Sequence, residues 1–274
     1  MSLVNLNAIL PEAKREKRAI AAFNISNYET ALAVVNAAEA EKRPVILQVY
    51  ARLFSDQRGS DLAGCLERLA HRAVQPVALH LDHGDNVGQV KEALTSGYTS
   101  VMYDGSCLPF DENVRIARFT ADYAHKLGAS AEGEIGHVSA AGKGVPTGVD
   151  EAEEFVRQTG VDALSIAIGN AHGYYAAAPS INLELCAAIA ARLPELPLVL
   201  HGATGTPREA IREAVRLGVA KVNIATEYQD VFLKTVRAEI NSEGDGFRPI
   251  DEVFAPAIFE CTQFARSFIR FLAE

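Results

Sequence analysis

Three short apolar runs in this chain each end in a histidine that is followed directly by a glycine. The pairs are His83-Gly84, His172-Gly173 and His201-Gly202. Apolar runs of this length, bounded by turn signals, are typical of buried strands. A single polar strand end is often only a hydrogen-bonded or capping residue. Three of them in one chain favour strands whose carboxyl ends meet around a shared site.

The chain has 274 residues, which is enough for two domains or for one α/β barrel. Strand-like runs alternate with helix-like runs, and no change in composition marks a linker. The expected strands cover residues 19–24, 44–49, 76–84, 100–105, 130–136, 163–172, 197–201 and 220–226. The expected helices between them lie at about residues 28–42, 62–72, 87–94, 111–127, 151–158 and 183–192, and a last one starts at about 206. After the eighth strand the chain is again mainly helical, from about 228 to 274. This order predicts a single (β/α)8 TIM barrel over residues 1–274, with residues 228–274 as an additional C-terminal helical extension.

Charge and composition argue against several classes of protein. The chain has 26 Lys and Arg residues and 35 Asp and Glu residues, a formal net charge of −9, and no basic stripe for nucleic acid. No apolar run is long enough to span a bilayer, and residues 1–20 lack the apolar core of a secretory signal. The four cysteines are widely spaced and form no C-x-x-C pair. We therefore expect a cytoplasmic protein with reduced cysteines and without nucleic-acid or membrane partners.

Side chains able to do chemistry follow most of the expected strands. In a TIM barrel such residues belong at the carboxyl ends of the strands, where the active site lies. The expected ends carry Asn24, Asp82, His83, Asp104, Glu134, His172, His201, Asn223 and Thr226. Three imidazoles from three strands suit a catalytic divalent metal that keeps positions open for substrate. No cysteine lies near them, which favours zinc or a similar ion that exchanges oxygen ligands.

Two carboxylates, Glu132 and Glu134, lie two residues apart in the fifth expected strand. Period 2 places both on one face, which is either a solvated face or the interior of the barrel. Strands of a parallel barrel are covered on both sides, so carboxylates there need partners. Each metal-binding imidazole also needs an acceptor on its other nitrogen, and Asp104 or Glu134 could supply one.

A phosphate site is predicted beside the histidines. Residues 202–205, Gly-Ala-Thr-Gly, expose backbone amides next to a helix start that has Thr206 at the N-cap and Pro207 at the first helical position. A helix amino terminus after the seventh strand, with Asn223 and Thr226 after the eighth, is the usual phosphate grip of a barrel. The alternative is a glycine-rich turn that merely connects two elements.

Metal beside phosphate indicates chemistry on a phosphorylated carbonyl compound. A Lewis acid on a ketone and its neighbouring hydroxyl stabilises an enediolate, which serves carbon–carbon cleavage or isomerisation. Asp82, next to His83, is placed to move a proton to or from the second fragment. A metal-dependent isomerase or epimerase of a sugar phosphate and a catalytically silent sugar-phosphate-binding protein are the alternatives. A Schiff-base aldolase is disfavoured, because Lys221 stands at the beginning of its strand and Lys143 stands in a loop.

The chain resembles the class II, metal-dependent fructose- and tagatose-bisphosphate aldolases over about residues 1–240. The motifs that carry the resemblance are 22–24 (AFN), 80–84 (HLDHG), 100–106 (SVMYDGS), 132–136 (EGEIG), 167–173 (AIGNAHG), 200–205 (LHGATG) and 221–227 (KVNIATE). The resemblance implies reversible, zinc-dependent cleavage of a phosphorylated ketose to dihydroxyacetone phosphate and an aldehyde, a reaction of glycolysis and carbohydrate metabolism. It also implies a homodimer or a homotetramer.

The resemblance further implies a role for each matching residue. His83, His172 and His201 would hold the zinc, which Co²⁺, Mn²⁺ or Fe²⁺ could replace, and Asp82 would donate the proton to the acceptor half. Asp104 and Glu134 match a second metal position. Gly173 and Gly202 match a site for a monovalent cation, Na⁺ or K⁺. The residues that would bind the substrate are Asn24, Gly173, Gly202, Ala203, Thr204, Asn223, Ile224, Ala225 and Thr226.

Several positions depart from the family's pattern. Tyr50 stands where many relatives have serine, Cys107 replaces a frequent histidine, and residues 174–178 (YYAAA) replace a Lys or Ser near the phosphate. These changes predict an acceptor pocket that is less suited to a second phosphate. The loop from 137 to 150 is rich in glycine and shorter than usual, and it lacks the acidic segment that supplies the donor-side base in relatives. Asp150 and Glu151 are the nearest candidates for that base.

Overall fold

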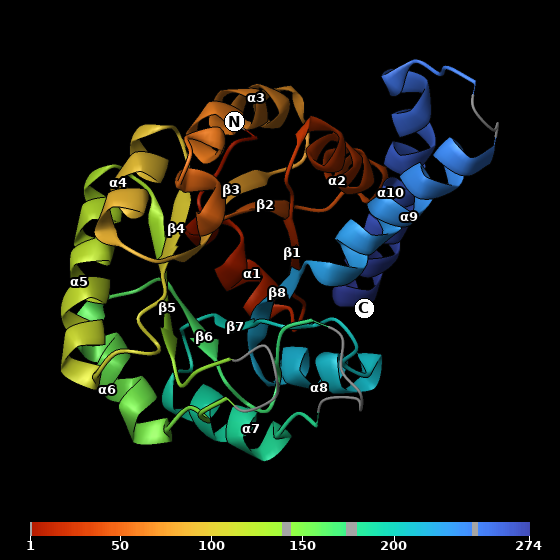
Figure 1. The fold of residues 1–274 in the computed structure, drawn as a ribbon. Coiled ribbons are helices and arrows are strands. Elements are labelled where there is room, and N and C mark those ends of the chain that lie inside the picture. The colour runs from red at the N-terminus through yellow and green to blue at the C-terminus, as the bar shows by residue number, and fades with distance from the viewer. Residues whose placement is uncertain (1, 139–143, 174–179, 243–245) are drawn as a thin grey trace.

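The computed structural model describes residues 2–138, 144–173, 180–242 and 246–274. Eight parallel strands form one closed barrel in sequence order, with helices between them, which confirms the predicted (β/α)8 fold (Figure 1). The strands are β1 Ile20–Asn24, β2 Val45–Tyr50, β3 Val77–Gly84, β4 Ser100–Tyr103, β5 Ser130–Ile135, β6 Ala163–Ile166, β7 Leu198–Leu200 and β8 Val219–Ile224. Almost every strand residue is buried, because the helices cover the outside of the sheet and side chains fill its inside.

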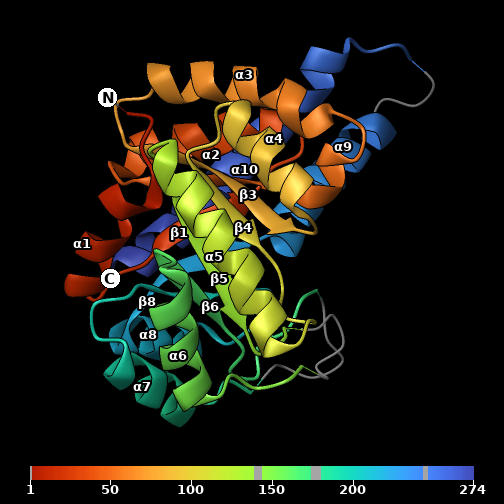
Figure 2. The ribbon, with the colours of Figure 1, turned by 90° about the vertical axis from the view of Figure 1, so that its left-hand side faces the viewer.

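Helices surround the barrel and connect its strands (Figures 1 and 2). The connecting helices are α2 Tyr28–Glu41, α3 Arg58–Arg72, α4 Val87–Thr95, α5 Phe110–Lys126, α6 Val149–Thr159, α7 Leu183–Arg192 and α8 Arg208–Leu217. A 3-10 helix, η2 (Ala51–Phe54), follows β2 directly. The predicted C-terminal helices are α9 (Thr226–Ser242) and α10 (Ile250–Ala273). None of the helices described is long and apolar enough to cross a membrane.

Asparagine side chains cap three of the α-helices, whereas α8 departs from its predicted start. The side chains of Asn27, Asn86 and Asn182 each accept a hydrogen bond from a backbone amide in the first turn of the helix that follows. At α8 the cap position belongs to Pro207, whose ψ of 132° is extended, so the helix begins one residue later than predicted. Thr206 caps nothing there. Its hydroxyl donates instead to the carbonyl oxygen of Gly202 at 3.3 Å.

Inside the barrel the side chains change from apolar to polar along the strands. Near the amino ends they form a small apolar cluster that includes Ile20, Ala22, Ile46, Ala78, Ala163, Val199 and Ala220. Two residues further along, neighbouring strands present Asn24, Gln48 and His80 at paired positions. The interior therefore has an apolar floor and a polar layer above it, toward the carboxyl ends of the strands.

An N-terminal segment that was not predicted closes the floor of the barrel. It consists of η1 (Leu6–Ala8) and α1 (Leu10–Arg15). Leu6 and Leu10 are buried in the apolar cluster of the floor. The backbone amide of Leu6 also donates to Ser130 Oγ at 3.0 Å. A helix as short as α1 shows no full period of apolar residues, so sequence patterning could not identify it.

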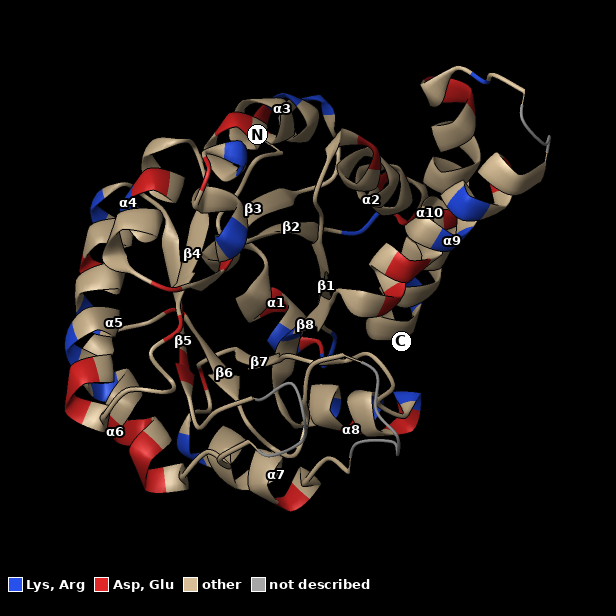
Figure 3. Ribbon diagram, in the orientation of Figure 1, with Lys and Arg blue, Asp and Glu red and all other residues tan. Residues whose placement is uncertain are grey.

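The C-terminal helices cover the barrel next to its first strand. α10 packs along α2 and α9 and also contacts β1. Glu41 of α2 binds two arginines of α10, Arg266 at 2.7 Å and Arg270 at 2.6 Å. The distal part of the α9–α10 pair extends beyond the barrel (Figures 1 and 2). Figure 3 shows Lys and Arg interspersed with Asp and Glu over the outer helices.

Candidate active site

Three histidines from three separate segments meet at the carboxyl end of the barrel. His83 is in β3, His172 lies in the segment after β6, and His201 directly follows β7. Each offers one ligand atom, and these atoms all lie within 4.8 Å of one another. The structure therefore brings together the three residues that were predicted to hold a metal.

Local backbone features aim these imidazoles at one another. His83 has a φ of 52°, in the left-handed region, at a point where the register between β3 and β4 shifts. Such irregularities redirect a side chain that a regular strand would place elsewhere. Asn170 joins the other two histidine segments, because its Oδ1 accepts from the Ile168 amide at 2.8 Å and its Nδ2 donates to the His201 carbonyl at 2.9 Å.

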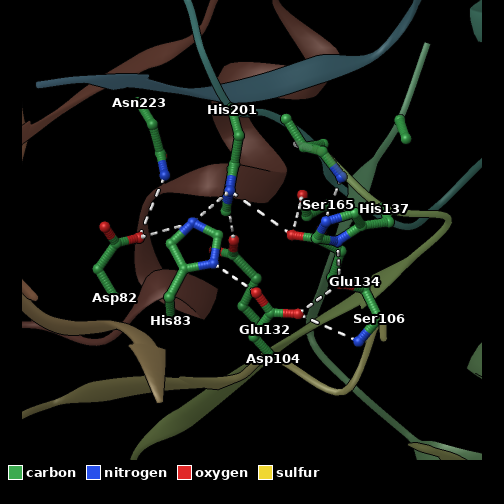
Figure 4. A network of polar contacts seen from close by, with 12 residues as sticks. Asp82, His83, Asp104, Ser106, Glu132, Glu134, His137, Ser165, His201 and Asn223 are labelled. Carbon is green, nitrogen blue, oxygen red and sulfur yellow. Dashed lines mark hydrogen bonds and ion pairs between the residues drawn. The ribbon is translucent and has the colours of Figure 1, made fainter. Parts of the chain in front are cut away.

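A ring nitrogen of His83 faces a ring nitrogen of His201. His83 Nε2 and His201 Nδ1 are 3.0 Å apart, a pair whose lone pairs need a proton or a cation between them (Figure 4). His83 Nδ1 is hydrogen-bonded to Asp104 Oδ2 at 2.7 Å, and His201 Nε2 is hydrogen-bonded to Glu132 Oε1 at 2.9 Å. Carboxylates on the far nitrogens are typical of metal-binding histidines. This donor set fits a divalent ion such as zinc.

The electrostatics of the imidazoles favour a bound cation. Burial, together with a positive His83, lowers the pKa of His172 to about 4 and that of His201 well below its usual value. Both rings are therefore neutral near pH 7 and able to bind a metal. Burial also opposes a charge on His83, but Asp82 and Asp104 outweigh that effect and raise the pKa of His83 to about 10. Asp82 and Asp104 thus favour a positive charge at His83, and a divalent cation bound there can supply that charge in place of the proton.

A second candidate metal group consists of His83, Asp104 and Glu134. Glu134 Oε2 accepts from Ser165 Oγ at 3.1 Å and lies 3.6 Å from His201 Nδ1. Burial, and then the negative charge of Asp104, raise the pKa of Glu134 to about 8. Glu134 therefore retains a proton near neutral pH unless a cation neutralises the group. The two carboxylates predicted for a second metal position do lie together.

A buried ion pair lies behind the histidines. Lys221 Nζ is 2.8 Å from Glu132 Oε2, and both side chains are fully buried. Lys221 is inside β8 rather than at its beginning, one correction to the sequence interpretation. It is nevertheless no Schiff-base candidate, because its ammonium group is held by Glu132 and it does not line the cavity described below. His80 also belongs to this layer, with Nδ1 2.8 Å from Ser100 Oγ.

Asp82 is held by two asparagine amides beside the histidines. Asn24 Nδ2 donates to Asp82 Oδ2 at 2.6 Å, and Asn223 Nδ2 donates to Oδ1 at 3.3 Å. Gln48 Nε2 donates in turn to Asn24 Oδ1 at 3.0 Å. Asp82 Oδ1 lies 3.9 Å from His83 Nε2 (Figure 4). The carboxylate is therefore fixed next to the metal-binding group, where it can exchange a proton with a bound molecule.

A cavity of about 320 Å³ contains most of the predicted site residues. Its lining consists of Asn24, Tyr50, Asp82, His83, Asp104, Val138, His172, Gly173, Gly202, Thr204, Asn223, Ala225 and Thr226. His201 and Glu134 are buried and do not line it. The side chains of Ala203 and Ile224 pack into the apolar core, which leaves only their backbone groups available to a ligand.

One end of the cavity is suited to an anion. Gly202 has a φ of 64°, and a Cβ there would lie 2.0 Å from the carbonyl oxygen of Ala171, so only glycine fits. Thr226 lines the cavity and is also the first residue of α9, whose amino terminus favours negative charge. The start of α8 contributes no residue to the lining. The amino terminus of α9 therefore lies at this end, together with Gly202 and Thr204 of the turn that leads from β7 into α8.

Part of the surroundings lies outside the described residues, namely 139–143 in the loop after β5 and 174–179 after His172. The predicted departures at 174–178 are among them. The described part of the first loop is closed by an antiparallel bridge between His137 and Val145. His137 Nδ1 is 3.0 Å from Ser106 Oγ and 3.4 Å from Cys107 Sγ.

The two acidic residues considered for the donor-side base lie in the first turn of α6. Asp150 Oδ1 is 2.9 Å from Arg192 on α7, and its side chain is 87% exposed. Neither Asp150 nor Glu151 lines the cavity. The carboxylates among the described residues that do line it are Asp82 and Asp104.

Three contributors to the site were missed in the sequence. The hydrogen-bond acceptor for His201 is Glu132, whereas Asp104 or Glu134 had been expected. The available signal was the alternation of side chains along β5, which puts Glu132 on the same face as Glu134. Asn170 stands two residues before His172 and could have been noticed as an unusual polar residue between glycine and alanine. Gln48 is the single polar residue within the apolar run of β2.

Comparison with known proteins finds similar aldolases. A family model described as fructose-bisphosphate aldolase class-II matches residues 4–273. A 6-phospho-5-dehydro-2-deoxy-D-gluconate aldolase of Bacillus velezensis is 39% identical over 91% of this chain and 88% of its own length. A fructose-bisphosphate aldolase of Geobacillus stearothermophilus is 40% identical over 91% and 90%. Among solved structures, the YdjI aldolase of Escherichia coli K12 is similar with a TM-score of 0.89 and 32% identity, over 98% of this chain and 97% of the other.

Proposed function

Because this chain belongs to the class-II fructose-bisphosphate aldolase family, we propose that it is a zinc-dependent aldolase of a phosphorylated ketose. The products would be dihydroxyacetone phosphate and an aldehyde, and the reaction would be reversible. The observation that carries this proposal is the convergence of His83, His172 and His201 beside Asp82, next to a cavity with one end suited to an anion.

His83, His172 and His201 would hold the metal. When bound there, a divalent cation supplies Lewis acidity to the ketone and hydroxyl oxygens of the donor half. Nitrogen ligands without thiolate suit zinc, and cobalt, manganese or iron could take its place. Asp104 and Glu134 provide, with His83, a second position for a cation. The carbonyl groups of Gly173 and Gly202 are proposed ligands for Na⁺ or K⁺.

Other residues of the protein would bind the phosphate and transfer the proton. The amino terminus of α9, with Gly202, Thr204 and Asn223, would bind and orient the phosphate of the donor half. Asp82 would give a proton to the aldehyde oxygen in synthesis and take it back in cleavage. Its two amide donors, Asn24 and Asn223, hold the carboxylate in place beside His83.

A retro-aldol assay tests this proposal. Purified protein is incubated with ketose mono- and bisphosphates, with zinc, cobalt or manganese added, and dihydroxyacetone phosphate is measured. We expect metal-dependent release of dihydroxyacetone phosphate from at least one substrate. Formation of an isomer or epimer without cleavage would contradict the proposal.

We also propose that the protein is a homo-oligomer of the reducing cytoplasm. Its four cysteines are free. The α9–α10 pair and the segment between them carry large apolar side chains that are exposed in the single chain: Leu233, Ile240, Phe247, Ile250 and Phe259. Where such side chains form one contiguous patch, they are typical of a protein–protein contact. Light scattering of the protein as it elutes from a sizing column should give a dimer or a tetramer, and a monomer would contradict this.

A further inference from the structure

A second cavity lies at the amino end of the barrel, opposite the proposed aldol site. Its volume is about 200 Å³. Its walls come from α1, from the start of β1, from the turns that enter β2 and β3, and from the end of α10. Figure 2 shows α1 and the C-terminus on the same side of the molecule. Because active sites of TIM barrels lie at the carboxyl ends of the strands, this cavity is separate from the substrate site.

Most of the lining of the second cavity is apolar. Ile9, Ile20 and Ile269 line it, and all three are buried. Ala13 and Ala273 also line it, and their side chains are too small to fill the space. An apolar cavity of roughly 150 Å³ can hold a benzene ring. The second cavity is therefore large enough for one ring or for a short hydrocarbon chain.

Three basic side chains line the same cavity, namely Arg18, Lys42 and Arg43. Arg18 is paired with Glu16. Arg43 is half-buried, and among the residues that the structure describes neither Lys42 nor Arg43 has a side-chain hydrogen bond or an ion pair. A partly buried guanidinium normally has a partner, because burial of an unpaired charge costs free energy. Arg43 therefore indicates an anion that the described part of the protein does not supply.

The end of α2 accounts for one of these cations but not for both. Lys42 is the C-cap of α2 and is exposed, so its charge suits the negative end of the helix dipole. Arg43 lies beyond the cap and lines the cavity. One carboxylate, that of the exposed Glu12, also lines the cavity. Its charge disfavours a ligand that carries more than one negative charge.

We propose that this cavity binds a small organic acid, with an apolar body inside the cavity and one anionic group beside Arg43 and Lys42. Buried isoleucines alone would suit a hydrocarbon, and unpaired cations alone would suit an inorganic anion. Their combination selects a molecule that has both parts. Such a ligand would contact α1, β1 and α10 together and would thereby stabilise the folded chain. The site does not depend on the aldolase proposal.

Four small molecules test this proposal. 3-Phenylpropionate has both the apolar body and the anion, 3-phenylpropionamide is its neutral counterpart, 3-phenylpropylamine has the opposite charge, and acetate has the anion without the body. Each is titrated into the whole zinc-loaded chain, and the methyl groups of Ile9, Ile20 and Ile269 are followed by NMR. Because these three side chains line this cavity, their signals separate binding here from binding at another anion site.

Three variants accompany the titrations. Arg43→Ala removes the unpaired guanidinium, and Ala273→Phe fills part of the cavity while leaving its charges in place. The control is Arg15→Ala, which removes an exposed arginine of α1 that does not line the cavity.

3-Phenylpropionate should shift the three methyl signals with a Kd of about 1 mM or below, and it should bind more tightly than the other three molecules. Loss of a charged hydrogen bond predicts that Arg43→Ala weakens binding of 3-phenylpropionate at least about 10-fold. Binding of the amide should change by less than about 3-fold. Ala273→Phe should weaken binding of both, and Arg15→Ala should match the wild type.

Three results would overturn the proposal. Equal binding of the anion, the amide and the amine would show that Arg43 selects no charge. Shifts of the same size with acetate would reveal an anion site without a place for an apolar body. If 3-phenylpropionate at up to about 10 mM leaves the three methyl signals unmoved, the cavity does not bind this class of ligand.

Discussion

His201 Nε2 lies 2.9 Å from Glu132 Oε1, while the other oxygen of Glu132 lies 2.8 Å from Lys221 Nζ. An ionised carboxylate only accepts, so His201 carries its proton on Nε2 and keeps Nδ1 free toward His83. The ion pair thus selects the tautomer that can bind a metal. Both of its members are fully buried, which makes the pair sensitive to the loss of either one.

Glu132→Gln should weaken metal binding by about 10- to 100-fold, since the amide cannot fix the tautomer of His201 as a carboxylate does. It should also destabilise the fold by about 3–5 kcal/mol, because Lys221 is left as a buried charge. Metal titration and urea unfolding measure the two effects. Adding Lys221→Met should restore stability but not metal affinity. If the double variant regains both stability and metal affinity, Glu132 acts only through the fold. The control is Glu184→Gln, which changes an exposed glutamate.

Protons should compete with the metal at His83. The pKa of His83 is about 10, so the ring is protonated at neutral pH and must lose that proton when it binds a metal. The affinity for zinc should therefore fall as pH is lowered, by at least about tenfold per unit between about pH 8 and pH 6. Competition with a chromophoric chelator at each pH measures it. An affinity that is constant over this range would remove His83 from the metal site.

His201→Ala should lose most of the bound metal, because a site with three protein ligands has no spare imidazole. Metal content after dialysis, determined by mass spectrometry, gives the result. The control is His71→Ala, which removes an exposed imidazole from α3. Near-stoichiometric zinc in the His201 variant would show that His201 is no ligand.

The strand alternation explains how much of this site the sequence could predict. Apolar runs that end in His, Asp or Asn placed His83, Asp104 and Asn223 at one end of a barrel, and the structure has them there. Alternation assigns a side chain to the interior but does not say which side chain faces it across the barrel. That distance depends on strand tilt and barrel closure. The pairing of Glu132 with His201 was therefore beyond sequence reasoning.

Local departures account for the other differences. Thr206 has the sequence of a cap, but Pro207 takes the cap position and Thr206 turns to Gly202. Leu6 and Leu10 close the barrel floor from a segment too short to show a period. Tyr50 was expected, as a replacement for serine, to make the acceptor pocket less suited to a second phosphate. Its stacking with Arg52 is a three-dimensional contact between residues two apart, which period 2 alone does not determine.

Asp82→Asn should separate the two proton transfers of the reaction. Asn24 and Asn223 both donate hydrogen bonds to the oxygens of Asp82. An asparagine at position 82 would place its own NH2 group against one of these two donors, and its amide cannot give up a proton. We expect the variant to retain its metal, to lose cleavage, and still to exchange a donor-carbon proton of dihydroxyacetone phosphate in heavy water, followed by NMR. Asp85→Asn, an exposed neighbour, is the control. If exchange is lost together with cleavage while metal is retained, Asp82 serves both transfers.

The dependence of carbon–carbon cleavage on a removable metal tests the central claim most directly. Release of dihydroxyacetone phosphate from the best substrate of the panel is measured before chelation, after chelation, and after zinc is returned, with a parallel sample treated with borohydride in the presence of substrate. We predict that chelation abolishes cleavage, that zinc restores it, and that borohydride leaves the enzyme active, because Lys221 is bound to Glu132 and away from the cavity. Cleavage that resists the chelator and is lost on borohydride treatment would contradict the account.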